Sequence, residues 1–389
     1  MSLKGNWNYP TPITVGEGCL QQIAQACRGA GISNALLVTD PGLAALPMVT
    51  ETVALCREAG IGCEVFSRIQ GNPTGENVED GLTVYRQGGF DGVIAFGGGS
   101  SLDAAKAIAL MAGQSLPLWA FEDVGDNWLQ ANVDAIAPVI AIPTTAGTGS
   151  EVGRASVITD TANHVKKIIF HPKMLPVRVL LDPAVTTGLP PHITAATGMD
   201  ALSHNLEAYC ANGYHPMAEG IALEGIRLIK AYLPQAVADG SNLEARTQML
   251  VASSMGATAF QRGLGGMHAI AHTLGALYDK HHGLLNAILM PYVLVANRSA
   301  IEDKLTHLAR YLDLPEPGFD AFLTWVLDFR AALQIPHTLA DIDITVEEAQ
   351  RVGRMAVQDP SAGGNPVALS AEQYSRIFVD AVTGRLPQH

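Results

Sequence analysis

DGVIAFGGGS, residues 91–100, places four apolar residues directly before three glycines and a serine. An apolar run without polar alternation is typical of a strand that is buried on both faces of a parallel sheet. The glycines allow a sharp turn, and Ser100 can cap a helix that starts there. This stretch predicts a strand–turn–helix unit of an α/β fold.

The same design recurs along the first half of the chain. VIAIPTTAGTGSE (139–151) is again an apolar run followed by a loop of small residues, and further β-rich runs are ALLVTD (35–40), GCEVFS (62–67) and VRVLLDP (177–183). Helical patterns lie between these runs. Such alternation predicts a parallel sheet with helices on both faces, and VRVLLDP is its last predicted strand.

The pattern changes after TTGLPP (186–191), where long helical stretches begin and continue to the C-terminus. We therefore predict two domains: an α/β domain over residues 1–186 and a helical domain over residues 187–389. A length of 389 residues suits two domains, and 48% hydrophobic residues suffice for two cores.

Composition narrows the class of protein. A formal charge of -13 argues against a nucleic-acid-binding surface, which needs a basic patch. The five scattered cysteines indicate reduced thiols rather than a disulfide framework. No run of 18 apolar residues and no secretory signal are found, so we expect a cytoplasmic protein without a membrane partner.

Two loops are candidates for phosphate binding. Glycine lets a phosphate approach the backbone at the start of a helix, although the loop at residues 97–100 is equally explained as a tight turn. No G-x-G-x-x-G motif is present. The threonine-rich loop at 144–151 favours a ligand, because both loops then lie at the carboxyl edge of one sheet. Asp40 ends another strand, where it either binds a ribose diol or caps a turn.

The helical half carries an unusual set of histidines. Asp200 and His204 are four residues apart, as are His268 and His272, so each pair projects from one helix face. His281 and His282 follow shortly afterwards. One aspartate with several imidazoles suits a divalent ion such as Zn²⁺ or Fe²⁺. The alternative is that each histidine is a hydrogen-bonded core or capping residue.

At this point the chain resembles a known family. GGGSSLDAAK, PTTAGTGSEV, GMDALSHNLEAY and HAIAHTLGALYDKHHG are similar to the signatures of iron-containing (group III) alcohol dehydrogenases, including a subgroup with 4-hydroxybutyrate dehydrogenases. The resemblance runs from about Pro10 to NPVALSAEQY (365–374). It implies a dehydroquinate synthase-like fold: an N-terminal dinucleotide domain with a parallel sheet, an all-α C-terminal domain, and a metal in the cleft between them.

The resemblance also implies roles for individual residues. It implies a proton-relay role for His272. His281 matches no ligand of the family and is left either behind the ligand set or on the surface. The implied metal ligands are Asp200, His204, His268 and His282. The implied NAD-binding residues are Asp40, Asn72, Gly97, Gly98, Gly99, Ser100, Asp103, Thr144, Thr145, Thr148 and Lys166, with Lys167 leaving the last position uncertain by one residue.

Two arginines depart from the pattern of simple alcohol dehydrogenases. Arg262 lies six residues before His268, and Arg154 follows Gly153, where a threonine is frequent in the family. A guanidinium holds a carboxylate through two parallel hydrogen bonds, so either arginine is a candidate anchor for an ω-hydroxy acid such as 4-hydroxybutyrate. The alternative for Arg262 is a structural salt bridge or a dimer-surface contact.

Together these features predict an enzyme that uses NAD and one divalent metal, Fe²⁺ or Zn²⁺, to interconvert a primary alcohol and an aldehyde. The family suggests a homodimer or a larger homo-oligomer. Alternatives are a dehydroquinate synthase-like lyase, a glycerol dehydrogenase-like polyol oxidation, and a non-catalytic metal-binding protein. The lyase would require several basic residues near the metal motifs, where the sequence has few.

Overall fold

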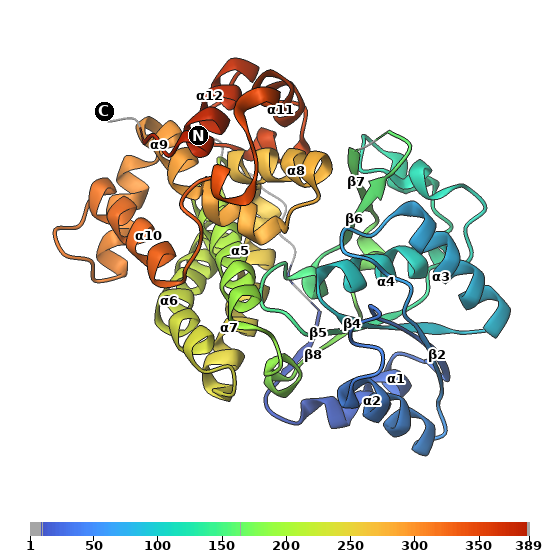
Figure 1. Cartoon of the computed structure of the whole chain (residues 1–389). Coiled ribbons are helices and arrows are strands. Elements are labelled where there is room, and N and C mark those ends of the chain that lie inside the picture. The colour runs from blue at the N-terminus through green and yellow to red at the C-terminus, as the bar shows by residue number, and fades with distance from the viewer. Residues whose placement is uncertain (1–8, 10, 164, 387–389) are drawn as a thin grey trace. The chain divides into compact units, whose positions relative to one another are not determined.

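The computed structural model describes Tyr9, residues 11–163 and residues 165–386. These residues form two compact units, one over Tyr9–Leu189 and one that begins at Pro190. The change from one unit to the other falls within TTGLPP (186–191), where the composition of the chain changes. Figure 1 shows strands with helices in the first unit and helices in the second.

The first unit is built on a parallel sheet of six strands. All its described pairs are parallel, and the strands of its centre are almost wholly buried, which explains their uninterrupted apolar sequences. In spatial order the strands are β1 (Ile13–Val15), β8 (Arg178–Leu181), β5 (Val139–Pro143), β4 (Gly92–Gly97), β2 (Asn34–Val38) and β3 (Gly62–Phe66).

Helices cover both faces of this sheet, as Figure 1 shows. On one face, α1 (Ile23–Gly29) and α2 (Pro47–Glu58) share a core with alternate residues of the central strands, including Leu37, Ile94 and Ile140. On the other face lie α3 (Gly75–Gly88) and α4 (Gly99–Met111). The predicted α/β class is therefore confirmed.

An antiparallel hairpin of β6 (Ala155–Asp160) and β7 (Val165–Phe170) stands apart from the main sheet. The sequence did not predict this hairpin, because its two strands are not continuous buried apolar runs. The strand β6 instead alternates buried and half-buried residues, the pattern of a strand with one covered face. The three-residue strand β1 was also not predicted.

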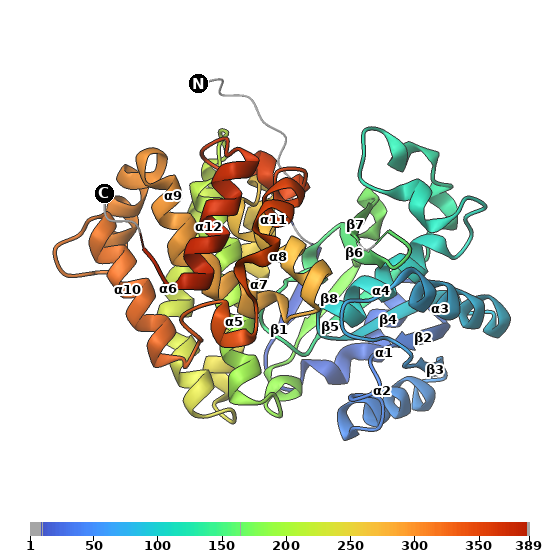
Figure 2. The same cartoon turned by 45° about the horizontal axis from the view of Figure 1, so that its top comes forward.

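The second unit is helical throughout its described residues. Figure 2 shows α5 packed among its neighbours, and it contacts α6, α7 and α9, while α9 also contacts α8 and α10. The helices are α5 (Pro191–Cys210), α6 (Pro216–Ala238), α7 (Leu243–Ala259), α8 (Gly266–Tyr278), α9 (His282–Tyr311), α10 (Phe319–Ala332), α11 (Ala349–Ala356) and α12 (Ala371–Thr383).

Two helices form the centre of this unit. Every residue of α5 from Thr194 to Cys210 is buried, including polar side chains that need partners. The helix α9 has 30 residues and is long and apolar enough, by length and composition, to cross a membrane. However, 72% of its apolar window is buried inside the protein, and core helices of soluble proteins also meet this criterion. We therefore interpret α9 as a core helix.

Candidate functional site

Four predicted ligand side chains converge in the helical unit. Asp200 and His204 project from α5, His268 from α8, and His282 from the first residue of α9. One ligand atom from each lies within 4.8 Å of the corresponding atoms of the others. The first three residues are buried and His282 is half-buried. Because these residues come from three helices, only the folded chain brings them together.

The start of α9 approaches α5 closely because Gly283 lacks a side chain. A Cβ atom at this position would lie 2.5 Å from the carbonyl oxygen of Ala196 and 2.9 Å from the Cβ of Asp200. Any side chain would therefore push the two helices apart. The preceding His281 is exposed, and its Nδ1 accepts a hydrogen bond from the N–H of Leu284. His281 is thus the N-cap of α9 and not a fifth member of the set.

The amide of Asn286 lies among the ligand atoms. Its Nδ2 donates to Asp200 Oδ1 at 2.8 Å and lies 3.2 Å from His268 Nε2 and 3.1 Å from His282 Nε2. An amide has two N–H bonds, but three acceptor atoms surround this nitrogen. Its Oδ1 is buried and has no hydrogen-bond partner among the described residues. More lone pairs converge here than the protein donors satisfy.

A carboxylate oxygen with three imidazole nitrogens is a donor set for borderline divalent ions such as Zn²⁺ or Fe²⁺. The rings are also packed closely, with His204 and His268 stacked at 4.7 Å between centroids. Burial holds the pKa of His268 well below its usual range, so this imidazole is neutral, the form that binds metals. The residues therefore fit one divalent ion.

Glu207 lies directly behind His268. Its Oε2 is 2.6 Å from His268 Nδ1, and its two oxygens also accept the N–H groups of Gly265 and Met267 at 2.7 Å each. Burial raises the pKa of Glu207 to about 7, while these backbone N–H groups act to lower it. A buried carboxyl with three donors thus orients one of the candidate ligands.

His272 contacts the set without belonging to it. Its ring stacks on that of His282, with centroids 5.1 Å apart, and its Nδ1 lies 3.0 Å from Asp359 Oδ2. Burial acts to raise the pKa of Asp359, but the neighbouring His272 and the N–H of Ser361 hold it below its usual range. The resulting carboxylate orients the His272 ring.

In the first unit, the two predicted phosphate loops lie side by side. The N–H of Thr144 donates to the carbonyl of Gly97 at 2.9 Å, where β5 and β4 end. Gly97 has φ +144°, which favours glycine, and a Cβ at Gly99 would lie 2.5 Å from Thr148 Cγ2. The side chain of Thr145 faces Gly98. The sequence predicted this juxtaposition correctly.

The side chain of Asp103 forms hydrogen bonds with Ser150 of the second loop and with Val157, which follows that loop in the sequence. Its Oδ1 accepts from Ser150 Oγ at 2.5 Å and its Oδ2 accepts the N–H of Val157 at 2.9 Å. The Lys106 ammonium lies 3.3 Å from Oδ1 and also contacts the carbonyl of Ala155. Both carboxylate oxygens of Asp103 thus have partners within the protein. This side chain therefore has a structural role, which differs from direct contact with a phosphate.

Four further predicted cofactor residues have defined surroundings. Asp40 Oδ1 accepts the N–H groups of Gly42 and Leu43 at 2.9 and 3.1 Å, so it forms the turn that the sequence left as an alternative. Lys166 Nζ donates to Asn72 Oδ1 at 2.7 Å. The neighbouring Lys167 instead lies 3.2 Å from Glu122 and 3.3 Å from Asp160. Ser100 lies half-buried in the first turn of α4, whose N-cap is Gly98, so the prediction that Ser100 caps this helix is wrong.

The guanidinium of Arg262 forms its hydrogen bonds and its ion pair with other residues of the helical unit. Its guanidinium donates to the carbonyls of Ala208, Tyr209 and Gly213, at or just beyond the end of α5, and pairs with Glu219 at 2.7 Å. Only 5% of its side chain is exposed. These contacts correspond to the structural salt bridge, and no contact in the described residues favours the anchor role.

Arg154 lies in the other unit, at the start of the β6–β7 hairpin. Its guanidinium stands over the ring of Phe170, 5.6 Å from the centroid. It also acts to lower the pKa of Asp123, which burial raises. Arg154 and Arg262 therefore belong to different units.

Comparison with protein families adds an independent finding. Residues 10–183 match the family described as iron-containing alcohol dehydrogenase, and residues 194–382 match the C-terminal domain of the Fe-containing alcohol dehydrogenase family. The chain belongs to the iron-containing alcohol dehydrogenase family. The predicted family is thus confirmed.

Relatives of this iron-containing alcohol dehydrogenase family member align over nearly their full length. The chain is 37% identical to a 4-hydroxybutyrate dehydrogenase of Cupriavidus necator, over 95% of this chain and 98% of that protein. It is 36% identical to a 1,3-propanediol dehydrogenase of Citrobacter freundii (94% and 96%) and 33% identical to an NAD-dependent methanol dehydrogenase of Bacillus methanolicus (97% and 100%).

Solved structures of similar proteins agree with this fold. A crystal structure of a 1,3-propanediol oxidoreductase superposes with a TM-score of 0.91 at 35% identity, covering 97% of this chain and 100% of that one. An alcohol dehydrogenase from Oenococcus oeni gives 0.90 at 30% identity, with coverage of 97% and 100%. These comparisons give no support to the lyase or polyol alternatives.

Sequence reasoning missed three residues of the helical site. Glu207 follows His204 by three residues, and Asn286 follows His282 by four, so helical spacing could have placed both on the ligand faces. Asp359 is 87 residues away from its partner His272, and no local pattern predicts that contact.

Proposed function

We propose that this family member is an NAD-dependent alcohol dehydrogenase that transfers a hydride between the cofactor and a primary alcohol or aldehyde. The observation that carries the proposal is the convergence of Asp200, His204, His268 and His282 within 4.8 Å of one another. These four residues would hold one divalent ion, Fe²⁺ or Zn²⁺. The family name favours iron, and the donor set suits both ions.

A divalent ion in this set supplies Lewis acidity, which lowers the pKa of an alcohol and polarises an aldehyde. The chain's own residues handle the proton. His272 Nε2 exchanges the hydroxyl proton, while Asp359 holds Nδ1 and thereby orients the ring. The hydride chemistry belongs to the nicotinamide, and the protein positions its reacting partners.

NAD would bind to the first unit. The loops at residues 97–100 and 144–148 offer backbone N–H groups and threonine hydroxyls at the carboxyl edge of the sheet, the usual ligand position in open α/β folds. Asp40 would accept from a ribose hydroxyl through Oδ2, which makes no hydrogen bond within the described part of the chain. Asn72 and Lys166 would contact the cofactor as a pair.

Substrates of the class are small primary alcohols, and ω-hydroxy acids such as 4-hydroxybutyrate are included because a relative named for that activity is 37% identical. This inclusion rests on the relative and not on Arg262, whose donors are engaged in its own unit. We further propose a cytoplasmic homodimer or larger homo-oligomer without nucleic-acid or membrane partners, in keeping with the charge of -13 and the buried α9.

A substrate panel tests this function. Protein loaded with Fe²⁺ or Zn²⁺ is mixed with NAD and 1,3-propanediol, 4-hydroxybutyrate, 1-butanol or glycerol, and nicotinamide absorbance is followed. We expect reduction of NAD with at least one of the first three. Activity confined to glycerol would instead support polyol oxidation. No NAD reduction with any alcohol, and no NADH oxidation with the matching aldehydes, would refute the proposal.

A further inference from the structure

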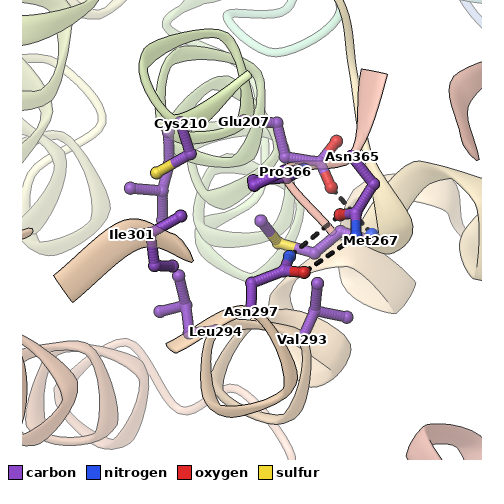
Figure 3. A pocket seen from close by; sticks show the side chains of 10 residues that line it. Glu207, Cys210, Met267, Val293, Leu294, Asn297, Ile301, Asn365 and Pro366 are labelled. Atoms are coloured by element: carbon purple, nitrogen blue, oxygen red, sulfur yellow. Dashed lines mark hydrogen bonds between the residues drawn. The ribbon is translucent and has the colours of Figure 1, made fainter. Parts of the chain in front are cut away.

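Glu207 lies on the same helix as two of the candidate ligands and contacts a third, His268. It follows Asp200 by seven residues and His204 by three, so all three project from one face of α5. Unlike the other two, it does not reach the ligand cluster itself. Its carboxyl group lies on the far side of His268, where it also borders a small cavity that Figure 3 shows with Met267 and Asn365.

The contact between Glu207 and His268 specifies which imidazole nitrogen carries the proton. Glu207 Oε2 lies 2.6 Å from His268 Nδ1, and both side chains are at least 95% buried. The same carboxyl already accepts two backbone N–H groups, from Gly265 and Met267. Each carboxyl oxygen therefore already acts as an acceptor for a backbone N–H, and in the contact with Oε2 the donor is His268 Nδ1. The lone pair of Nε2 then points to the opposite side of the ring.

That opposite side is the candidate metal position. His268 Nε2 is 3.2 Å from Asn286 Nδ2, the atom that also contacts Asp200 and His282. We propose that Glu207 is a positioning residue that holds His268 with its proton on Nδ1 and its Nε2 directed at the divalent ion. This inference rests on the proposed function, in which the four convergent residues hold that ion. Carboxylates that orient a metal-binding histidine in this way raise metal affinity about 10–100-fold.

A glutamine could not accept from all three donors that this carboxyl serves. Glu207 Oε2 serves Gly265 and His268, while Oε1 serves Met267. A glutamine has one acceptor oxygen, so its NH₂ group would have to face at least one of these donors. If the NH₂ group faced His268, it would favour a lone pair on Nδ1 and a proton on Nε2, the tautomer that cannot bind through Nε2.

The competing explanation is that Glu207 merely secures the start of α8. The chain offers a matched control for it, because Asn365 Oδ1 accepts the N–H of Gly266 at 2.9 Å in the same turn. Asn365 is buried and also exchanges hydrogen bonds with Asn297, as Figure 3 shows. In the described part of the chain, the Asn365 side chain hydrogen-bonds Gly266, Asn297 and Val367 and none of the four candidate ligands, so its removal disturbs the helix start without touching His268 directly.

The experiment compares Glu207→Gln and Asn365→Ala with the wild type. Each full-length protein is stripped with a chelator, and the affinity for Zn²⁺ and the visible spectrum of the Co²⁺ form are measured along with the melting temperature. We expect Glu207→Gln to weaken Zn²⁺ binding about 10–100-fold and to alter the Co²⁺ spectrum. Asn365→Ala should lower the melting temperature but keep Zn²⁺ affinity within about 3-fold, a small change beside the effect of an orienting carboxylate.

Two results would overturn the inference: unchanged Zn²⁺ affinity in Glu207→Gln, or an equal loss of affinity in both variants. Failure of the proposed function is a different outcome, since wild-type protein would then bind no ion at these residues. If Glu207→Gln does not fold, nitrogen-15 NMR of histidine-labelled wild-type protein with Zn²⁺ decides the matter. The proton of His268 should reside on Nδ1, and a proton on Nε2 would contradict the role of Glu207.

Discussion

Asp40 combines the two roles that its sequence position suggested as alternatives. One carboxylate oxygen holds the turn at Gly42 and Leu43, and the other makes no hydrogen bond within the described residues. Replacement by asparagine retains an oxygen for the turn but removes the charge. The effect on cofactor choice can therefore be separated from an effect on the loop.

We expect Asp40→Asn to raise the ratio of kcat/KM for NADP over that for NAD by about tenfold, roughly 1.4 kcal/mol, because the wild-type carboxylate repels a 2′-phosphate. Steady-state kinetics with both cofactors give this ratio. Wild-type protein that prefers NADP, or an unchanged ratio in the variant, would show that Asp40 does not select the cofactor.

Arg262 makes contacts that its residue type and its position in the sequence do not indicate. A lone arginine near metal motifs suggested a carboxylate anchor, but its donors are used by α5 carbonyls and Glu219, contacts that only the folded chain reveals. We expect Arg262→Met to lower the free energy of unfolding by about 1–3 kcal/mol, since buried acceptors lose their donor. Urea denaturation measures this loss.

The same variant should leave substrate selectivity alone. The ratio of kcat/KM for 4-hydroxybutyrate over that for 1-butanol should stay within about 2-fold of wild type, because a substrate anchor would instead be worth about 1.5–3 kcal/mol on the acid alone. A selective loss on 4-hydroxybutyrate with unchanged stability would restore the anchor role.

The helix α9 is both a core helix and the element that carries part of the candidate metal site. It carries His282 and Asn286 in its first turns and contains Pro291, which has no N–H for the carbonyl of Ala287. The buried Arg330 of α10 fills this need, since its Nη1 donates to the carbonyls of Ala287 and Ile288 at 3.1 and 2.8 Å. The guanidinium thus stabilises the proline-containing turn.

We expect Arg330→Met to lower the free energy of unfolding by about 2–4 kcal/mol, because two buried carbonyls lose a charged donor. The matched control is Arg298→Met on α9, a half-buried arginine whose pairing with the exposed Glu302 and Asp320 should contribute no more than about 1 kcal/mol. Equal losses in the two variants, measured by urea denaturation, would show that Arg330 has no special role at Pro291.

Local sequence patterns predicted the elements unevenly. The buried strands β2, β4, β5 and β8 and the long helices have strong apolar signatures. The spacing of Asp200 with His204 and of His268 with His272 placed three of the four candidate ligands on helix faces. The β6–β7 hairpin was missed because its strands are partly exposed. Contacts such as His272–Asp359 depend on tertiary packing, which no local pattern encodes.

In the whole molecule, the candidate cofactor loops and the candidate metal site belong to different units. Tyr9–Leu189 carries the paired loops at the edge of a parallel sheet, and the helical unit from Pro190 carries the convergent aspartate and histidines. Each constellation forms within its own unit. The proposed reaction needs both, because the helical unit would hold the ion that supplies Lewis acidity and the first unit would hold the cofactor that supplies hydride chemistry.

The most direct test counts bound metal and activity in the same sample. Chelator-treated wild-type protein is titrated with Fe²⁺ without oxygen, or with Zn²⁺, while elemental analysis and NADH formation from 1,3-propanediol are recorded. Activity should rise with bound metal and stop rising at one ion per chain, and His282→Ala should lose both the ion and the activity. Full activity in metal-free protein, or one tightly held ion in His282→Ala, would contradict the proposed metal-dependent dehydrogenase.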